Sequence, residues 1–127
     1  MSHLNSQSIL FIQIADRICD RVLDGKYLPD SRIPSVRELS AEMEVNPNTV
    51  MRSFERLQRH GIIYNKRGIG YFISPEAREK VHELRHFHLM DEVLPSVFKE
   101  MLLLDIGMDE LTKAFQTYLS INKNKSI

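Results

Sequence analysis

Residues 33–57 read IPSVRELSAEMEVNPNTVMRSFERL, and the expected fold follows mainly from these residues. Ser35, followed three positions later by a glutamate, matches a capping box, in which both side chains bind free backbone amides at a helix start. The helix that follows is expected to end near Glu44. Asn46 then suits the N-cap of a second helix, and Pro47 suits its first position, where no amide hydrogen bond is lost. Two helices joined by so short a turn are typical of a helix-turn-helix.

The second of these helices is expected to run from Pro47 to His60. Val50, Phe54 and Leu57 recur at helical spacing and form its inward face. β-prone segments follow on either side of a glycine-containing loop, which predicts a short antiparallel hairpin with strands at 62–64 and 71–73 and the loop at 65–70.

A further helix precedes these elements, from about Ser8 to Asp24. Its apolar residues recur at helical spacing, and Gly25 stands where helices commonly end. Cys19 falls within the apolar stripe, and we interpret it as a small buried side chain rather than a reactive thiol. The order of helix, helix, turn, helix and hairpin predicts a mainly α fold with a small β-hairpin, a winged helix-turn-helix in residues 1–74.

Composition narrows the function. The chain has 127 residues, 43% of them hydrophobic, and its 17 Lys and Arg balance its 17 Asp and Glu. Neither a secretory signal nor an apolar run long enough to cross a bilayer is evident, and one cysteine cannot form an internal disulfide, so we expect a cytoplasmic protein. The charge is uneven, however: residues 46–74 hold five basic residues and one acid. Such a concentration is typical of a surface that faces phosphates, although a solvated helix face is the alternative.

Several residues in this region have the chemistry for contacts with DNA. The first residues of the second helix of a helix-turn-helix meet base edges in the major groove, where Asn48 can pair with adenine and Thr49 can offer a hydroxyl and a methyl group. Ser35 and Arg37 suit a phosphate at the rim of the groove. The hairpin tip, with its arginine and glycine, suits the adjacent minor groove. Taken singly, each of these features also fits a plain helix start or turn. The candidate DNA-binding residues are Ser35, Arg37, Asn46, Asn48, Thr49, Arg52, Lys66, Arg67 and Gly68.

The same residues resemble a known family. Residues 33–40 (IPSVRELS), 45–57 (VNPNTVMRSFERL), 61–63 (GII) and 67–73 (RGIGYFI) look like the GntR family of bacterial transcription regulators. The resemblance implies a homodimer that binds a palindromic operator, and it implies DNA contacts at Ser35, Arg37, Asn48, Thr49, Arg52, Arg67 and Gly68. One departure is Asp30, where the family usually has glycine, although Asp tolerates such turns.

Residues 75–127 are expected to form a helical dimerisation region. A long helix opens at residues 74–76, and Pro95 is expected to kink or interrupt it. The last helix is expected from about Met108 to Ile121, with its apolar face buried through Leu111, Phe115, Tyr118 and Leu119. Helices this apolar cannot shield themselves in so small a chain, so we expect them to pack against a second copy and to set two recognition helices about 34 Å apart.

The tail is similar to the short YtrA-like branch of the GntR family, which often controls transporter operons. That likeness rests on length and on residues 103–111, where Asp105 and Gly107 replace the usual glycine and serine. The expected function is therefore transcription regulation, most simply repression. The alternative is a DNA-associated assembly factor that uses the winged helix to recruit a protein partner.

Other functions have weaker support in the sequence. His82 and His86 share a helical face, as in two-histidine zinc sites, but a third ligand is not evident. We expect no metal, no cofactor and no catalytic residue, because no nucleophile and base pair stands out. Some aromatic and methionine side chains suit either a hydrophobic core or a cavity for an unknown small-molecule effector. These side chains are Tyr118, Phe115, Met90 and Met101.

Overall fold

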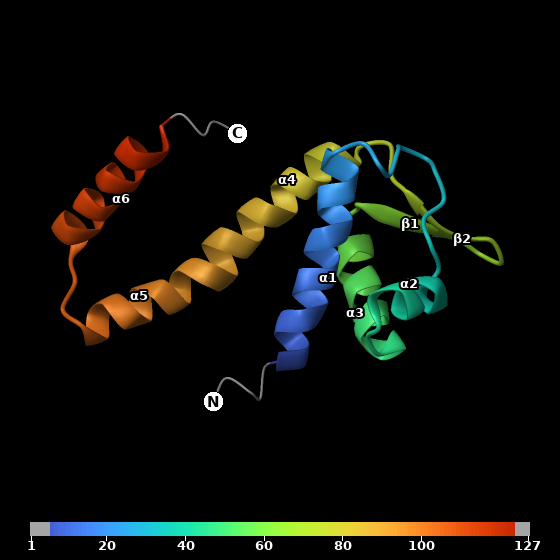
Figure 1. Ribbon diagram of the computed structural model, residues 1–127, viewed down its shortest axis with the longest axis horizontal. Helices are drawn as coiled ribbons and strands as arrows, with labels where there is room; N and C mark the ends of the chain where they lie inside the picture. Colours follow the sequence, from blue (N-terminus) through green and yellow to red (C-terminus); the bar gives the residue numbers. More distant parts are fainter. Residues whose placement is uncertain (1–5, 124–127) are drawn as a thin grey trace. The chain divides into compact units, whose positions relative to one another are not determined.

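The computed structural model describes residues 6–123, with side chains from residue 10 onward. The chain divides into two compact units, which meet in the sequence between Arg85 and His86. The first unit contains the predicted order of elements (Figure 1): α1 (Ser6–Leu23), α2 (Val36–Met43), α3 (Pro47–Arg59), β1 (Ile63–Lys66), β2 (Gly70–Ile73) and most of α4 (Ala77–Phe87). The predicted fold class, mainly helical with a small hairpin, is confirmed.

The core of the first unit lies where α1, α3 and the hairpin meet. Phe54 of α3 is fully buried, and its ring meets Tyr71 of β2 edge-on with centroids 4.8 Å apart. Ser53 joins α3 to α1, because its hydroxyl donates to the carbonyl of Phe11 over 2.7 Å. Cys19 is fully buried in the same core, as predicted. Its burial raises the pKa of the thiol to about 12, so the side chain acts as a small apolar group.

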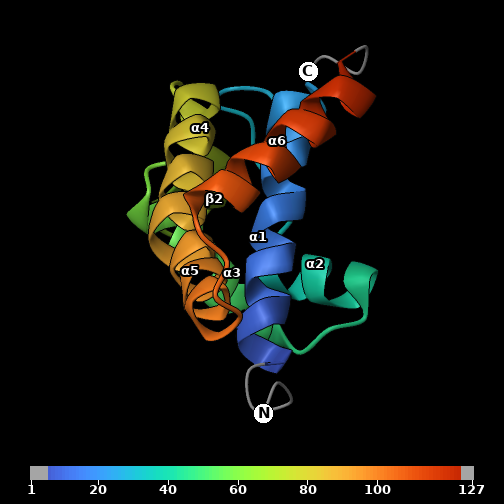
Figure 2. The same ribbon diagram turned by 90° about the vertical axis from the view of Figure 1, so that its left-hand side faces the viewer.

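The helix α2 packs on α3, and its end lies close to the N-terminal half of α1 (Figure 2). Leu10 and Ile14 of α1 line a shallow groove together with Met43, the last residue of α2, and Val45, which lies two residues beyond it. The two predicted caps fix this arrangement: Ser35 begins α2 with a complete capping box, and Asn46 begins α3 with Pro47 behind it. Both signals are local, which is why the sequence revealed them.

The hairpin is longer than predicted. Its antiparallel strands pair from Ile63 with Ile73 to Lys66 with Gly70, so the turn is reduced to residues 67–69. A third extended segment runs along the other edge of β2. There the amide of Ile33 donates to Tyr71 and the amide of Ile73 donates to Ser31, each over 3.0 Å. This segment pairs with β2 through a single antiparallel bridge, between Arg32 and Phe72.

The helix α4 belongs mostly to the first unit. Its residues Ala77, Val81 and Leu84 are buried in the core of the first unit. Arg85 binds the carboxylates of Asp16 and Asp20 of α1, with nitrogen–oxygen distances of 3.1 and 2.6 Å. The first compact unit therefore reaches well past residue 74, and we propose that α4 acts as the connection from the winged helix to the rest of the chain.

The described part of the second unit is mostly helical, with a π-helical turn η2 (His88–Val93), α5 (Leu94–Leu103) and α6 (Met108–Asn122). The expected interruption at Pro95 takes the form of η2, in which the amide of Leu94 donates to the carbonyl of Leu89, five residues back. Proline lacks an amide donor and its ring clashes with the carbonyl four residues back, and the wider π turn accommodates both. In the turn before α6, Asp105 adopts a left-handed conformation at φ 58°.

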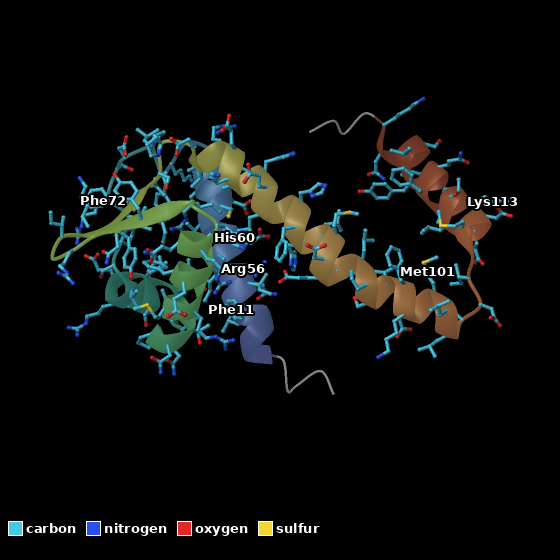
Figure 3. The ribbon with its side chains drawn as sticks, turned by 180° about the vertical axis from the view of Figure 1, so that it is seen from behind. Phe11, Arg56, His60, Phe72, Met101 and Lys113 are labelled. Atoms are coloured by element: carbon cyan, nitrogen blue, oxygen red, sulfur yellow. The ribbon has the colours of Figure 1, made fainter. Side chains whose placement is uncertain are left out.

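The predicted burial in α6 was wrong for the single chain. Phe115 is 59% exposed, Tyr118 is 62% exposed, and no residue of α5 or α6 is buried. Figure 3 shows the side chains of both helices, with Met101 on α5 and Lys113 on α6 labelled. The helix was predicted correctly from the spacing of its apolar residues. Burial also requires other residues to pack over the apolar face, and the described residues do not cover it.

Candidate DNA-binding surface

The first turn of α2 presents Ser35 and Arg37. The amide of Glu38 donates to the Ser35 hydroxyl oxygen over 3.0 Å, and the Ser35 amide donates to the Glu38 carboxylate over 2.8 Å. These two hydrogen bonds lower the pKa of Glu38, with a smaller effect from the positive charge of Arg32. The Ser35 hydroxyl retains its proton for donation, and Arg37 is exposed on the same turn. A helix start of this kind can bind a phosphate.

The start of α3 exposes Asn48 but not Thr49. Asn46 caps the helix, since its side-chain oxygen accepts from the Asn48 amide over 2.7 Å, and both asparagines are exposed. Thr49 is only 5% exposed, so its side chain has little surface to offer a base. The sequence predicts a base contact for Thr49 because its hydroxyl and methyl groups have suitable chemistry and it lies in the first turn of the helix. Its place in that turn does not reveal that the side chain faces the core.

Farther along α3, only some of the basic residues are exposed. Arg52 is exposed and lies over the Phe11 ring of α1, with its guanidinium carbon 4.4 Å from the ring centroid. Arg56 is only 5% exposed, although it is one of the five basic residues in 46–74 from which the sequence predicts a surface that faces phosphates. The spacing of the hydrophobic residues marks the centre of the buried face of a helix but not its edges. At such an edge, the long aliphatic part of an arginine side chain can pack against apolar neighbours. The positive charge on the outside of α3 is correspondingly smaller than the sequence predicts.

The hairpin presents Lys66 from the end of β1 rather than from a loop. Its ammonium nitrogen is 4.6 Å from the centroid of the Phe72 ring, which stacks on Tyr64 at 5.7 Å. The Tyr64 hydroxyl donates to Asp30 over 2.9 Å, and this bond raises the pKa of Tyr64. Asp30 has φ 61°, so the aspartate does adopt the left-handed conformation that the family's usual glycine would favour. Figure 3 labels Phe72 on this face of the hairpin.

The turn of the hairpin exposes Arg67 and Gly68. Gly68 has φ +79°, and a Cβ there would meet nothing within 4 Å, so the backbone conformation and not crowding favours glycine. The amide of Ile69 closes the turn by donating to Lys66 over 2.9 Å. In Figure 1, this turn and α2 lie on the same side of the first unit.

Sequence reasoning missed Arg32 and Phe11. The Nε of Arg32 donates to the carbonyl of Ile69 over 3.2 Å, a contact between residues 37 positions apart. Neither residue stands in a local motif: Arg32 lies between the first predicted helix and the helix-turn-helix, and Phe11 reads as one of many apolar residues of α1. Only the folded chain brings them to the turn and to α3.

Other candidate sites found little support. Among residues 6–123, no group of three or more His, Cys, Asp or Glu side chains could hold a metal ion. In the same part of the chain, no helix has the length and apolarity needed to span a membrane. A hollow of about 250 Å³ lies beside the turn between α5 and α6, and of the four residues suggested for an effector cavity only Met101 lines it.

Comparisons with known proteins agree with this architecture. A sequence model described as bacterial regulatory proteins of the gntR family matches residues 11–73. The chain is 36% identical over 117 residues to the uncharacterised HTH-type transcriptional regulator YhcF of Bacillus subtilis, covering 92% of this chain and 95% of YhcF. It is 37% identical over 78 residues to the HTH-type transcriptional repressor YtrA of the same organism, covering 61% of this chain and 60% of YtrA.

Solved structures extend the likeness to most of the chain. A GntR-family regulator from Bacteroides thetaiotaomicron is 42% identical with a TM-score of 0.65, covering 89% of this chain and 98% of that one. One from Listeria monocytogenes is 26% identical with a TM-score of 0.62, covering 85% and 93%. The expected family is confirmed, with YtrA among its relatives. With its winged helix-turn-helix and near full-length relatives, the chain belongs to the gntR family of bacterial regulatory proteins and is a DNA-binding transcription regulator.

Proposed function

We propose that the chain is a homodimeric repressor that binds a palindromic operator in the cytoplasm. The observation that supports this most strongly is the exposure of Arg37, Asn48, Arg52 and Arg67 on the first unit, while the second unit leaves its apolar face uncovered. The repressor YtrA among the relatives favours repression. From the resemblance of residues 103–111 to the YtrA-like branch, we propose a transporter operon as the target.

In the proposed complex, α3 enters the major groove. Asn48 reads a base edge, because an asparagine amide can donate to and accept from adenine. Asn46 offers its side-chain NH₂ group, since its oxygen caps the helix. Arg52 approaches the phosphate backbone beside the groove. Thr49, being buried, contributes by fixing the start of α3 rather than by a large contact of its own.

The two flanks of α3 are proposed to bind the DNA backbone and the minor groove. Ser35 and Arg37 at the start of α2 receive a phosphate, where free amides and a positive side chain act together. Lys66 and Arg67 of the hairpin lie along the minor groove, where the negative potential attracts arginine, and Gly68 allows a close approach of the backbone.

The second unit is proposed to form the dimer. Large apolar side chains are exposed along α5, α6 and the turn between them, and they include Leu102 at 80%, Leu103 at 70%, Met108 at 68% and Ile121 at 73%. An uncovered apolar face of this extent is typical of an interface, and a two-fold pairing lets the same residues cover each other. A symmetric dimer would read an inverted repeat with half-sites about 34 Å apart.

Selection of bound fragments from a random duplex pool tests the proposal as a whole. We expect an inverted repeat, and we expect the protein to lower transcription from a promoter that carries it. A recovered site without symmetry contradicts the dimer model. Binding without any effect on transcription would favour the assembly-factor alternative instead.

Replacing Arg67 with alanine should weaken binding to every duplex by about tenfold and reduce the slope of log affinity against log salt by about 1, because one positive charge is lost from the surface that faces the DNA. Fluorescence anisotropy at several salt concentrations measures both quantities. Lys26→Ala is the matched control, since it removes an exposed positive charge in the loop after α1. Equal losses for the two variants would point to overall charge rather than to a wing contact.

Replacing Asn48 with alanine should have a different signature. We expect a loss of discrimination of about 1–3 kcal/mol at a single operator position, because a bidentate contact to one base disappears, while the salt dependence stays nearly unchanged. Competition between the selected operator and its single-base variants measures this. A uniform loss at all positions would contradict a base-reading role for Asn48.

A further inference from the structure

Arg32 lies on the extended segment that runs along β2. The paired amides of Ile33 and Ile73 hold this segment at the edge of β2 that β1 leaves open, and Arg32 stands opposite Phe72 there. The backbone of Arg32 is therefore fixed relative to the sheet. Its side chain remains exposed to solvent.

The guanidinium of Arg32 reaches the turn of the hairpin. Its Nε donates to the carbonyl of Ile69 over 3.2 Å. Beside this bond is Gly70, where a Cβ would lie 2.8 Å from Nε and 3.4 Å from Nη2 of Arg32. Gly70 also has φ +145°, which L side chains rarely adopt. The guanidinium thus occupies the space that a side chain at position 70 would need.

Arg32 also precedes Ser35, the cap of α2, by three residues, and its positive charge makes a small contribution to lowering the pKa of Glu38. Arg32 thus lies between two parts of the proposed DNA-binding surface, the hairpin turn and the first turn of α2. Within the described residues, Ile69 is the one hydrogen-bond acceptor for its guanidinium.

We propose that Arg32 is a positioning residue that fixes the hairpin turn so that Arg67 meets the DNA in one conformation. A two-stranded hairpin is only marginally stable by itself, and the ordering of a mobile turn on binding costs affinity. The hydrogen bond from Arg32 to Ile69 orders the turn in the free protein, so this cost is avoided on binding. This inference rests on the proposed DNA-binding surface, because it assigns Arg32 an effect that passes through Arg67.

A double-mutant cycle in the full chain tests the inference, with affinity for the selected operator as the readout. We expect Arg32→Ala to weaken binding by about tenfold. In an Arg67→Ala background, the same change should weaken binding by less than about twofold, because the turn then has no side chain to position. In an Arg37→Ala background, Arg32→Ala should keep its full effect, since Arg37 is on a different element.

Arg32→Lys separates positioning from charge. Lysine retains the positive charge but places a methylene where the Nε–H stood, so we expect it to reproduce most of the loss. It also serves as the test if Arg32→Ala melts at a much lower temperature than the parent. Parent-like binding by Arg32→Lys, or full additivity of the Arg32 and Arg67 changes, overturns the inference. If Arg67→Ala itself leaves binding unchanged, the wing contact fails and the inference fails with it, which is a distinguishable result.

Discussion

Phe115→Glu is expected to convert the dimer into a monomer and to weaken operator binding by at least about 100-fold. Phe115 is 59% exposed in the single chain, so the substitution should leave the fold of each chain intact. In the proposed dimer, it would bury an unpaired carboxylate, which costs several kcal/mol. The monomers would then occupy two half-sites independently and lose the gain from linkage, which is commonly 10²- to 10⁴-fold.

Sedimentation velocity at micromolar concentration measures the first effect, and anisotropy with the selected operator measures the second. Gln116→Glu is the matched control, because it places the same carboxylate at the neighbouring exposed position of α6. We expect that control to remain dimeric and to bind like the parent. A dimeric Phe115→Glu protein would place the subunit contact elsewhere and contradict the proposed interface.

Phe54→Ala is expected to destabilise the first unit by about 3–5 kcal/mol, the usual cost of removing a buried phenylalanine ring. Phe54 is fully buried and contacts Tyr71 edge-on, so its loss leaves a cavity between α3 and the hairpin. Because a small domain has a total stability of only about 5–15 kcal/mol, a large part of it would be lost.

Urea denaturation followed by circular dichroism measures this loss at a fixed protein concentration, since dimerisation makes stability depend on concentration. Met51→Ala is the control on the same helix, because Met51 is 37% exposed, and we expect it to cost less than about 1 kcal/mol. Equal costs for the two variants would mean that the hairpin does not pack on Phe54 in solution.

The elements of the winged helix could be predicted because their signals are local. Ser35 with its glutamate, and Asn46 with Pro47, mark helix starts through hydrogen bonds that span three residues or fewer. The order of these elements was sufficient to identify the helix-turn-helix. Strand lengths were less predictable, because the pairing of Lys66 with Gly70 depends on the partner strand and not on β propensity.

The outward faces of the helices could be predicted only in part. The hydrophobic period marks the centre of a buried face, and it did so for Val50, Phe54 and Leu57. At the edge of that face, Thr49 and Arg56 are buried although their polarity suggested exposure. On α6 the error was reversed, because an apolar face is buried only when something covers it.

The helix starts, the element order and the family of the chain follow from local patterns of residues, because capping and periodicity act over a few residues. The packing of the folded chain is needed to learn which polar side chains remain on the surface and which distant residues support them. Arg32 and Ile69 are 37 positions apart, and Phe11 meets Arg52 across two helices. Such contacts depend on how several elements pack together, and no local pattern encodes that packing.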